Sequence, residues 1–168
     1  SDVCSSDLDE TALAVDGGGN VIAAGIFYGK TDFDPTATSA GDTLTSARNG
    51  SGYTTDSFVW KLSPAGAFQW VRGMGGTGGD WTNDVVLDVA GNIYTTGSFS
   101  GKKDFDPGKG TYSLTSAGGS DVFISKLDTA GNFVYAGALG GPANDGAGGI
   151  AIDGSSSVYL TGGFSGTA

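Results

Sequence analysis

Two short motifs place carboxylates at a spacing that suits a hard cation. Residues 104–108 read Asp-Phe-Asp-Pro-Gly, and residues 32–36 read Asp-Phe-Asp-Pro-Thr. Positions i and i+2 of an extended segment point to the same side, so each motif offers a pair of carboxylates to an ion such as Ca²⁺. The sequence therefore makes calcium the only cofactor to consider, and its candidate ligands are Asp104, Asp106, Asp32 and Asp34.

A structural turn is the other interpretation of these motifs. Aspartate accepts hydrogen bonds from nearby backbone N–H groups, and proline fixes φ. A complete calcium site uses roughly six to eight oxygen ligands, and no third carboxylate follows at calcium-loop spacing. Three lysines, Lys30, Lys102 and Lys103, are close enough in sequence to neutralise the aspartates. Both interpretations stay open at this point.

The residues that interrupt the repeat are the candidate ligand contacts. Trp81 stands where the next repeat has Gly146, and we expect it in a loop. There it would stack on a sugar, pack against a protein partner, or cap the end of a sheet interface. An insertion in the first repeat supplies further non-repeating surface. The candidate contacts are Trp81, Asp80, Asp84, Arg48 and Tyr53.

The sequence predicts no enzyme activity and no catalytic residues. It contains no histidine, which removes the commonest general base and the Ser-His-Asp triad. Residues 73–78 fit Gly-x-Gly-x-x-Gly, but no helix pattern follows, as a nucleotide site would require. Glycoside chemistry would have to use Asp80, Asp84 and Asp145. Because Asp80 and Asp145 occupy matched repeat positions, we expect them instead to hold the glycine-rich turns that precede them.

These residues lie within an internal repeat. Segments of similar sequence recur 72 and then 65 residues apart, at 16–27, 88–99 and, more loosely, 153–164. A second block, 56–66, recurs at 121–131. The difference in spacing comes from a longer loop between Pro35 and Asp56. Loops tolerate insertions of this kind, so the pattern indicates a structural repeat.

Each repeat has the periodicity of β-strands. Phe58, Trp60 and Leu62 alternate with other residues, and no window favours an amphipathic helix. The middle repeat contains four predicted strands, near 85–88, 92–98, 122–127 and 133–138. Four antiparallel strands make one propeller blade. With ten strands in all, the predicted fold is all-β, a β-propeller fragment of about two and a half four-stranded antiparallel blades in an open arc.

The repeats divide the chain into segments. Residues 1–8 match nothing later and are interpreted as a non-native or disordered segment; the propeller repeats fill 9–168, at about 12–83, 84–148 and, in part, 149–168. An incomplete ring leaves sheet edges and apolar faces bare. We therefore expect a fragment of a larger protein that is marginally stable or self-associating alone. The remaining propeller blades of the parent chain would be its first partners.

Composition restricts the other partners. The chain carries 8 basic and 18 acidic residues, a net charge of −10, which disfavours nucleic acid and anionic membrane surfaces. No run of apolar residues is long enough for membrane insertion. The only cysteine, Cys4, lies in the 1–8 segment, so no disulfide is expected. A protein or a glycan remains as the partner.

Three segments carry a resemblance to a known family. Residues 91–97, 121–128 and 139–141, with Asp145 ahead of 150–153, resemble the SBBP-type bacterial β-propeller repeat. The resemblance implies a propeller and an extracellular or cell-surface location, and it implies no activity. Residues 155–157 are three serines where the family has Gly-Asn, so we expect that turn to differ.

The predicted function is a non-enzymatic secreted or cell-surface module for binding or scaffolding. The alternatives are a calcium-stabilised structural propeller and a carbohydrate-binding or carbohydrate-active propeller.

Overall fold

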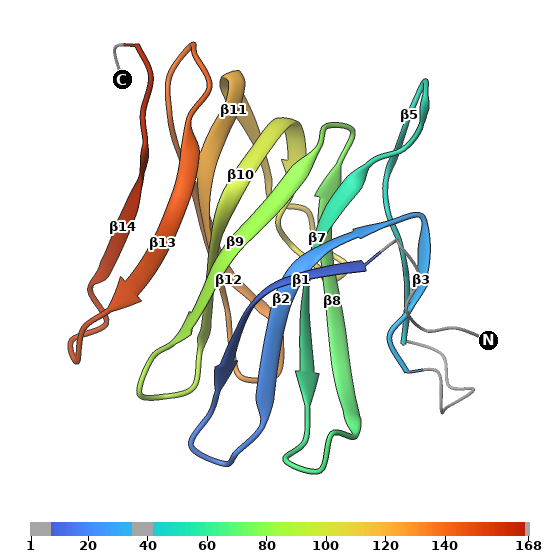
Figure 1. The fold of residues 1–168 in the computed structure, drawn as a ribbon, viewed down its shortest axis with the longest axis vertical. Helices are drawn as coiled ribbons and strands as arrows, with labels where there is room; N and C mark the ends of the chain where they lie inside the picture. Colours follow the sequence, from blue (N-terminus) through green and yellow to red (C-terminus); the bar gives the residue numbers. More distant parts are fainter. Residues whose placement is uncertain (1–7, 35–41, 167–168) are drawn as a thin grey trace.

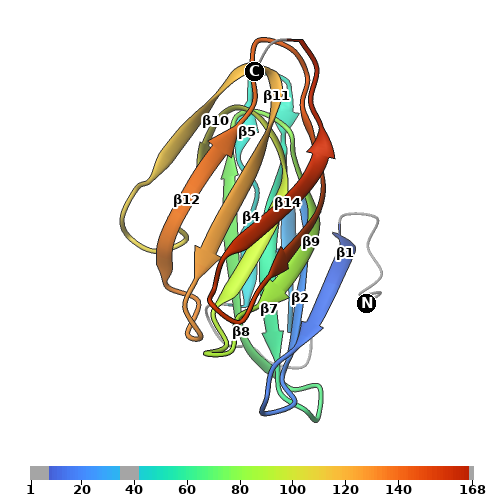
Figure 2. The ribbon, with the colours of Figure 1, turned by 90° about the vertical axis from the view of Figure 1, so that its left-hand side faces the viewer.

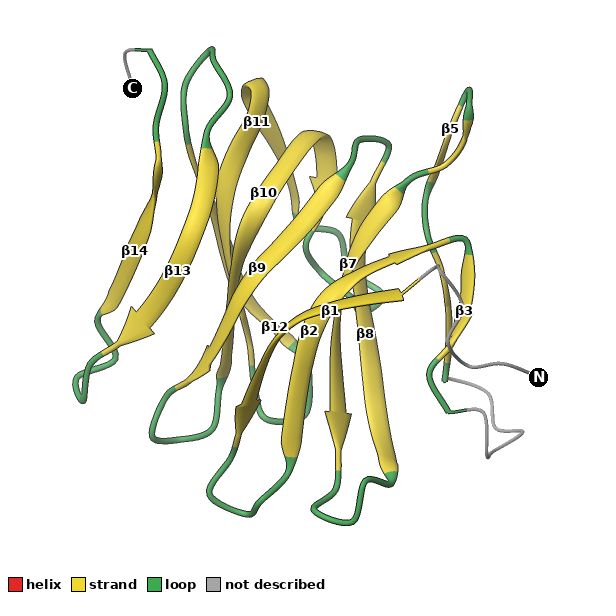
Figure 3. Ribbon diagram, in the orientation of Figure 1, coloured by secondary structure: helices red, strands yellow, loops and turns green. Residues whose placement is uncertain are grey.

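The computed structural model describes residues 8–34 and 42–166, and over these ranges the chain forms only strands and loops (Figure 3). The prediction of an all-β fold is therefore confirmed. Ten strands have six or more residues, and four shorter strands, which the sequence did not indicate, lie in and beside the insertion. Within the described ranges, no helix has the length and apolar character that a membrane crossing requires.

The long strands form one antiparallel eight-stranded sheet and a separate hairpin (Figure 1). The large sheet consists of two four-strand parts, which we call the first sheet and the second sheet. The first sheet consists of β1 (Leu8–Val15), β2 (Val21–Tyr28), β7 (Thr55–Leu62) and β8 (Phe68–Gly76). The second sheet consists of β9 (Asp80–Leu87), β10 (Ile93–Asp104), β11 (Ser113–Leu127) and β12 (Phe133–Leu139). The hairpin pairs β13 (Gly146–Ile152) with β14 (Val158–Gly163).

The remaining strands are short. They are β3 (Lys30–Asp32), β4 (Thr43–Thr45), β5 (Arg48–Asn49) and β6 (Gly52–Tyr53). A two-residue pairing between β8 and β10 joins the first sheet to the second.

Two boundaries differ from the prediction. Trp81 lies inside β9, not in a loop, because β9 begins at Asp80, and β1 begins at Leu8, one residue before the predicted repeats.

The matched segments fold in the same way, down to an irregularity in strand pairing. The register shifts once in β1–β2, once in β9–β10 and once in β13–β14, each time beside the same repeat position. At that position the second strand carries a glycine: Gly25, Gly97 and Gly162. The three hairpins therefore share a register shift at positions that also match in sequence.

Aromatic residues fill the core at matched positions. In the first repeat Phe33 lies 5.0 Å from Phe58 and 6.1 Å from Phe27 between ring centres. In the second repeat Phe105 lies 5.1 Å from Phe123 and 5.6 Å from Phe99. All six rings are buried. Each cluster gathers residues from three separate segments, so it fixes the loop after the second strand against the sheet.

Aspartates close the turns between strands. Oδ1 of Asp88 accepts hydrogen bonds from the backbone N–H of Ala90 and of Asn92, at 3.0 and 2.9 Å. The same pattern recurs at Asp16, Asp128 and Asp153. The fourth residue of these turns has a positive φ, between 79° and 80° where it is glycine. Only glycine adopts this backbone conformation without steric cost.

The serine-rich turn at 153–157 keeps the hydrogen bonds of the other turns and differs from them at one residue. Oδ1 of Asp153 accepts hydrogen bonds from Ser155 and Ser157, at 2.8 and 2.9 Å. The difference lies in Ser156, which has a φ of 63° although it carries a side chain. The aspartate therefore sets the turn, and Ser156 adopts a strained conformation.

Replacing Ser156 by glycine is expected to raise the free energy of unfolding by about 1 kcal/mol, because it removes the left-handed strain. Urea denaturation measures the change. Ser155→Gly, in the same turn and without a positive φ, is the matched control and should be neutral or slightly destabilising. Equal effects of the two substitutions would contradict the strain argument.

Successive sheets pack face to face (Figure 1). Strand β9 lies against β1, β2 and β7, so the second sheet covers one face of the first. Strand β13 in turn lies against β9, β10 and β11. Seen from the side, β14 is in front, and β12 emerges beside the β13–β14 hairpin, not behind it (Figure 2). The hairpin therefore covers only part of the second sheet.

Candidate functional site

The 104–108 segment is a hydrogen-bonded loop. Oδ1 of Asp104 accepts the backbone N–H of Asp106 at 3.1 Å and that of Tyr112 at 2.9 Å. Oδ1 of Asp106 accepts the N–H of Gly108 at 2.8 Å. The intervening Phe105 is buried. Both aspartates therefore act as acceptors that shape the loop.

The matched motif in the first repeat has the same beginning. Oδ1 of Asp32 accepts the backbone N–H of Asp34 at 3.0 Å, and Phe33 is buried between them. Pro35, the next residue of the motif, lies outside the described residues. Neither motif is joined by a third acidic side chain at metal-binding distance within the described ranges.

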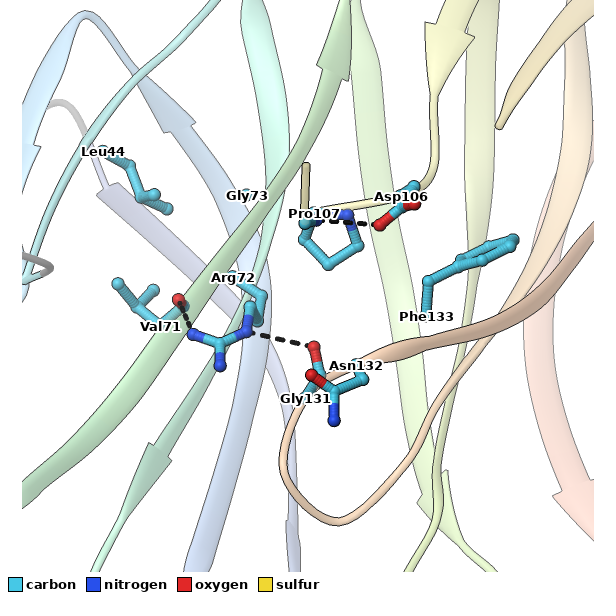
Figure 4. Close-up of a pocket in the computed structure, with 10 residues that line it drawn as sticks. Leu44, Val71, Arg72, Gly73, Asp106, Pro107, Gly131, Asn132 and Phe133 are labelled. Carbon is cyan, nitrogen blue, oxygen red and sulfur yellow. Dashed lines mark hydrogen bonds between the residues drawn. The ribbon is translucent and has the colours of Figure 1, made fainter. Parts of the chain in front are cut away.

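The 106–108 loop forms one wall of a groove of about 480 Å³ (Figure 4). Strand β8 forms the opposite wall, and the 131–133 segment of the second sheet closes one end. A second hollow of about 330 Å³ shares the loop and extends to Asp104 and Asp56. The groove thus follows the seam between the two sheets.

Arg72 crosses this seam. Its Nε donates to the carbonyl of Gly131 at 3.0 Å, and its Nη2 donates to that of Ala130 at 3.0 Å. Its Nη1 donates to the carbonyl of Val71 at 2.9 Å. Burial lowers the pKa of Arg72 from its usual value. Because the guanidinium is committed to three backbone carbonyls, its role is to fasten the 128–132 turn to β8.

The loop geometry leads to a prediction about calcium. Asparagine retains the Oδ1 acceptor, so Asp104→Asn with Asp106→Asn should change the free energy of unfolding by less than about 1 kcal/mol. Asp104→Ala removes two hydrogen bonds and should cost about 1–3 kcal/mol. Thermal melts with calcium and with a chelator test this. A calcium-dependent rise in Tm that the asparagine variant lacks would contradict it and identify a calcium site.

The five candidate ligand contacts lie in different parts of the structure and have different surroundings. Trp81 is 49% exposed and folds back over Gly79, where an added Cβ would stand 3.0 Å from its ring. Asp84 is half-buried, and its Oδ2 accepts the backbone N–H of Ile150 at 2.9 Å, so it ties β9 to β13. Trp81 is therefore available to a ligand, whereas Asp84 serves the packing of the sheets.

Arg48 and Tyr53 form a small unit of their own. They face each other across the β5–β6 hairpin, and the guanidinium lies 4.4 Å from the ring centre. Tyr28 packs edge-on against Tyr53, at 5.9 Å. Arg48 is exposed, and the unit presents a positive charge backed by two aromatic rings.

Asp80 belongs to a buried charge cluster between the sheets. It has 0% exposure, and its Oδ2 lies 3.5 Å from Nζ of Lys103, whose exposure is also 0%. Nζ donates a hydrogen bond to Ser57 Oγ at 2.7 Å. It also lies over the rings of Phe123 and Phe105, at 4.5 and 5.0 Å. Lys103 of the second sheet thus reaches into the first.

Burial dominates the electrostatics of this cluster. It raises the pKa of Asp80 to about 7, against the opposing effect of the Lys103 charge, and it lowers the pKa of Lys103. Burial also raises the pKa of Asp56, which shares the charge of Lys103. Neither carboxylate oxygen of Asp80 accepts a hydrogen bond within the described ranges. The expected role of holding the preceding turn is therefore not seen for Asp80.

At the matched position, Asp145 does hold its turn, because its Oδ2 accepts the N–H of Gly141 at 2.7 Å. The sequence predicts Lys102 and Lys103 alike as charges beside the Asp-x-Asp motif, but Lys102 is exposed and Lys103 is buried. Its burial could have been read from the sequence, since Lys103 stands two residues before Phe105 and shares its face.

The face of the first sheet that points away from the second is apolar and open. Leu13 is 70% exposed and Val15 is 59% exposed on β1. Beside them lies a hollow of about 280 Å³, lined by Thr11, Ala12, Leu13, Val21, Ala23, Trp60 and Leu62. We call this surface, with Val15, the outer face of the first sheet.

A comparison of the sequence with protein-family models and with curated proteins finds no match.

Proposed function

We propose that this chain is a non-enzymatic repeat module of a secreted or cell-surface protein, in which each four-stranded sheet is one blade of a β-propeller. The described part would then comprise two blades and half of a third, arranged as an open arc. Its function would be binding or scaffolding. The extracellular location is supported by the resemblance to SBBP-type repeats alone.

One observation carries the proposal. Leu13 on the outer face is 70% exposed, whereas Val85, at the same position of the second repeat, is 3% exposed. Val85 is buried because the second sheet packs on the first. The outer face therefore has the composition of a surface that another sheet of this repeat type covers.

The second sheet gives a matching argument at its side nearest the C-terminal hairpin. Met74 on β8 is 2% exposed and touches Ser125 of β11. Its repeat counterpart, Leu139, is 45% exposed, because the β13–β14 hairpin provides no strands equivalent to β11 and β12. The occupant that fits both surfaces is a further sheet of the same repeat, from the parent chain or from a second copy.

Sedimentation velocity tests the proposal. We expect the chain alone to self-associate with rising concentration, and Leu13→Lys with Val15→Lys to reduce this association. Val89→Lys is the matched control, because Val89 is 90% exposed in a turn, away from the outer face. A wild-type protein that stays a monodisperse, cooperatively melting monomer would overturn the proposal.

Carbohydrate binding at Trp81 is a second candidate. The observation that favours it is the half-exposed indole at a position where the next repeat has no side chain. Aromatic side chains stack on the apolar faces of sugars. Glycan arrays probed with the wild type and with Trp81→Ala test this proposal. Glycan binding by the wild type that Trp81→Ala loses would support it, and absence of binding by both proteins would contradict it.

A further inference from the structure

Two buried carboxylates meet at the far end of the second sheet. Asp121 begins the inner half of β11, and Asp145 precedes β13; each is 2% exposed. Asp121 Oδ1 and Asp145 Oδ2 lie 2.6 and 2.7 Å from the point where a Cβ on Gly140 would stand. The two oxygens are thus neighbours, and only glycine leaves room beside them.

One oxygen of this pair lacks a partner. Both oxygens of Asp145 accept backbone N–H groups, from Gly141 and Ser165 at 2.7 Å each. Asp121 Oδ2 accepts the N–H of Ala117 at 2.7 Å. Asp121 Oδ1 is buried and has no hydrogen-bond partner among the described residues. Burying a charged oxygen without a partner is costly, so the pair calls for a positive charge.

The matched pair between the first and second sheets shows which kind of group fits. Asp56 and Asp80 occupy the repeat positions of Asp121 and Asp145, and the ammonium group of Lys103 compensates their charge. No lysine or arginine in the described part of the chain makes an ion pair with Asp121 or Asp145. In the third repeat, the sequence position of Lys103 is taken by Ala168, which lies outside the described residues.

We propose that Asp121 and Asp145 bind a hard metal cation, with Asp121 Oδ1 as the principal ligand. The donors are oxygens, which suits calcium and the alkali ions, and the two carboxylates carry a charge that a divalent ion neutralises. The ion would occupy the place that the Lys103 ammonium fills between the first and second sheets. This site differs from the Asp104 and Asp106 motif, and it does not rest on the proposed function.

Thermal melts of the chelator-treated full chain test the proposal. Calcium, magnesium, sodium and potassium are added as chlorides, with tetramethylammonium chloride holding the ionic strength constant. Calcium at about 100 times its Kd should raise Tm by roughly 5–10 °C. Asp121→Asn should abolish this shift. A shift with sodium or potassium alone, also lost in Asp121→Asn, supports the site and assigns it to a monovalent ion.

Two further variants make the test specific. Asp104→Asn with Asp106→Asn should retain the shift, which separates this site from the loop motif. Ala168→Lys places an ammonium group at the repeat position of Lys103; it should raise Tm without metal and remove the response to metal. This variant keeps the test decisive if Asp121→Asn does not fold. Absence of any cation-specific shift in the wild type, or its persistence in Asp121→Asn, would overturn the proposal.

Discussion

Replacing Lys103 by methionine is expected to lower the free energy of unfolding by about 3–5 kcal/mol at neutral pH. Methionine fills a similar volume, but it leaves the carboxylates of Asp80 and Asp56 buried without a cation. Urea denaturation at pH 7 measures the loss. Lys102→Met is the matched control, because the neighbouring Lys102 is exposed and should change stability by less than about 0.5 kcal/mol.

The effect should depend on pH in a defined direction. Asp80 has a folded pKa of about 7, above its usual value, so between about pH 4 and pH 7 the folded chain holds a proton that the unfolded chain has released. Wild-type stability from this group therefore falls as pH rises through that window. Near pH 4, Asp80 is protonated in the folded state, so the loss in Lys103→Met should shrink there.

At lower pH, Asp16 changes the free energy of unfolding in the opposite direction. Hydrogen bonds from Asn20 and an ion pair with Lys61 hold the pKa of Asp16 well below its usual range. The stabilisation of the folded state by ionised Asp16 is present above about pH 4 and is lost as pH falls further. Stability should therefore pass through a maximum near pH 4–5. A loss in Lys103→Met that stays constant from pH 4 to pH 7 would contradict the assigned roles of Asp80 and Lys103.

Replacing Gly97 by alanine is expected to cost about 3 kcal/mol of unfolding free energy. An added Cβ would overlap the backbone carbonyl oxygen of Trp81 and would stand 2.8 Å from the ring of Phe123. The carbonyl belongs to the neighbouring strand at the register shift, so it cannot move without breaking the pairing of β9 with β10. Thermal and urea denaturation measure the effect.

Gly163→Ala is the matched control for Gly97→Ala. Gly163 lies in β14, also has a negative φ, and has no atom within 4 Å of an added Cβ. It should change stability by less than about 1 kcal/mol, since alanine replaces glycine without a clash. Equal losses in both variants would show that a general property of strand glycines, and not the close approach at the register shift, determines the cost.

The repeat made most of the fold predictable. Because 16–27 and 88–99 have matching residues, the second strand of each sheet and the aspartate turn before it could be placed from sequence. The period of two identified the segments around Phe58 and Phe123 as strands. Strand ends were less predictable. β9 begins at Asp80 because a register shift lets the strand continue past Asn83, and such shifts leave no periodic signal.

The candidate site was predictable only in part. The Asp-x-Asp motifs form the hydrogen-bonded loops that the turn interpretation describes. Trp81 was identified by its departure from the repeat, although its surroundings were not. The charge cluster could not be predicted from the sequence, because the partners of Lys103 lie 23 and 46 residues away, at Asp80 and Ser57. Only the packing of one sheet on another brings them together.

The placement of Lys103 has a consequence for how the chain assembles. Similar units that are joined in tandem run the risk of docking on the wrong neighbour while they fold. Thr31 and Ala168 stand at the Lys103 position of the other repeats. In the native packing, Lys103 of the second sheet compensates the charge of Asp56 in the first sheet. A neighbouring sheet with Thr31 or Ala168 at that position would leave Asp56 buried without a cation, so Lys103 favours the native order of neighbours.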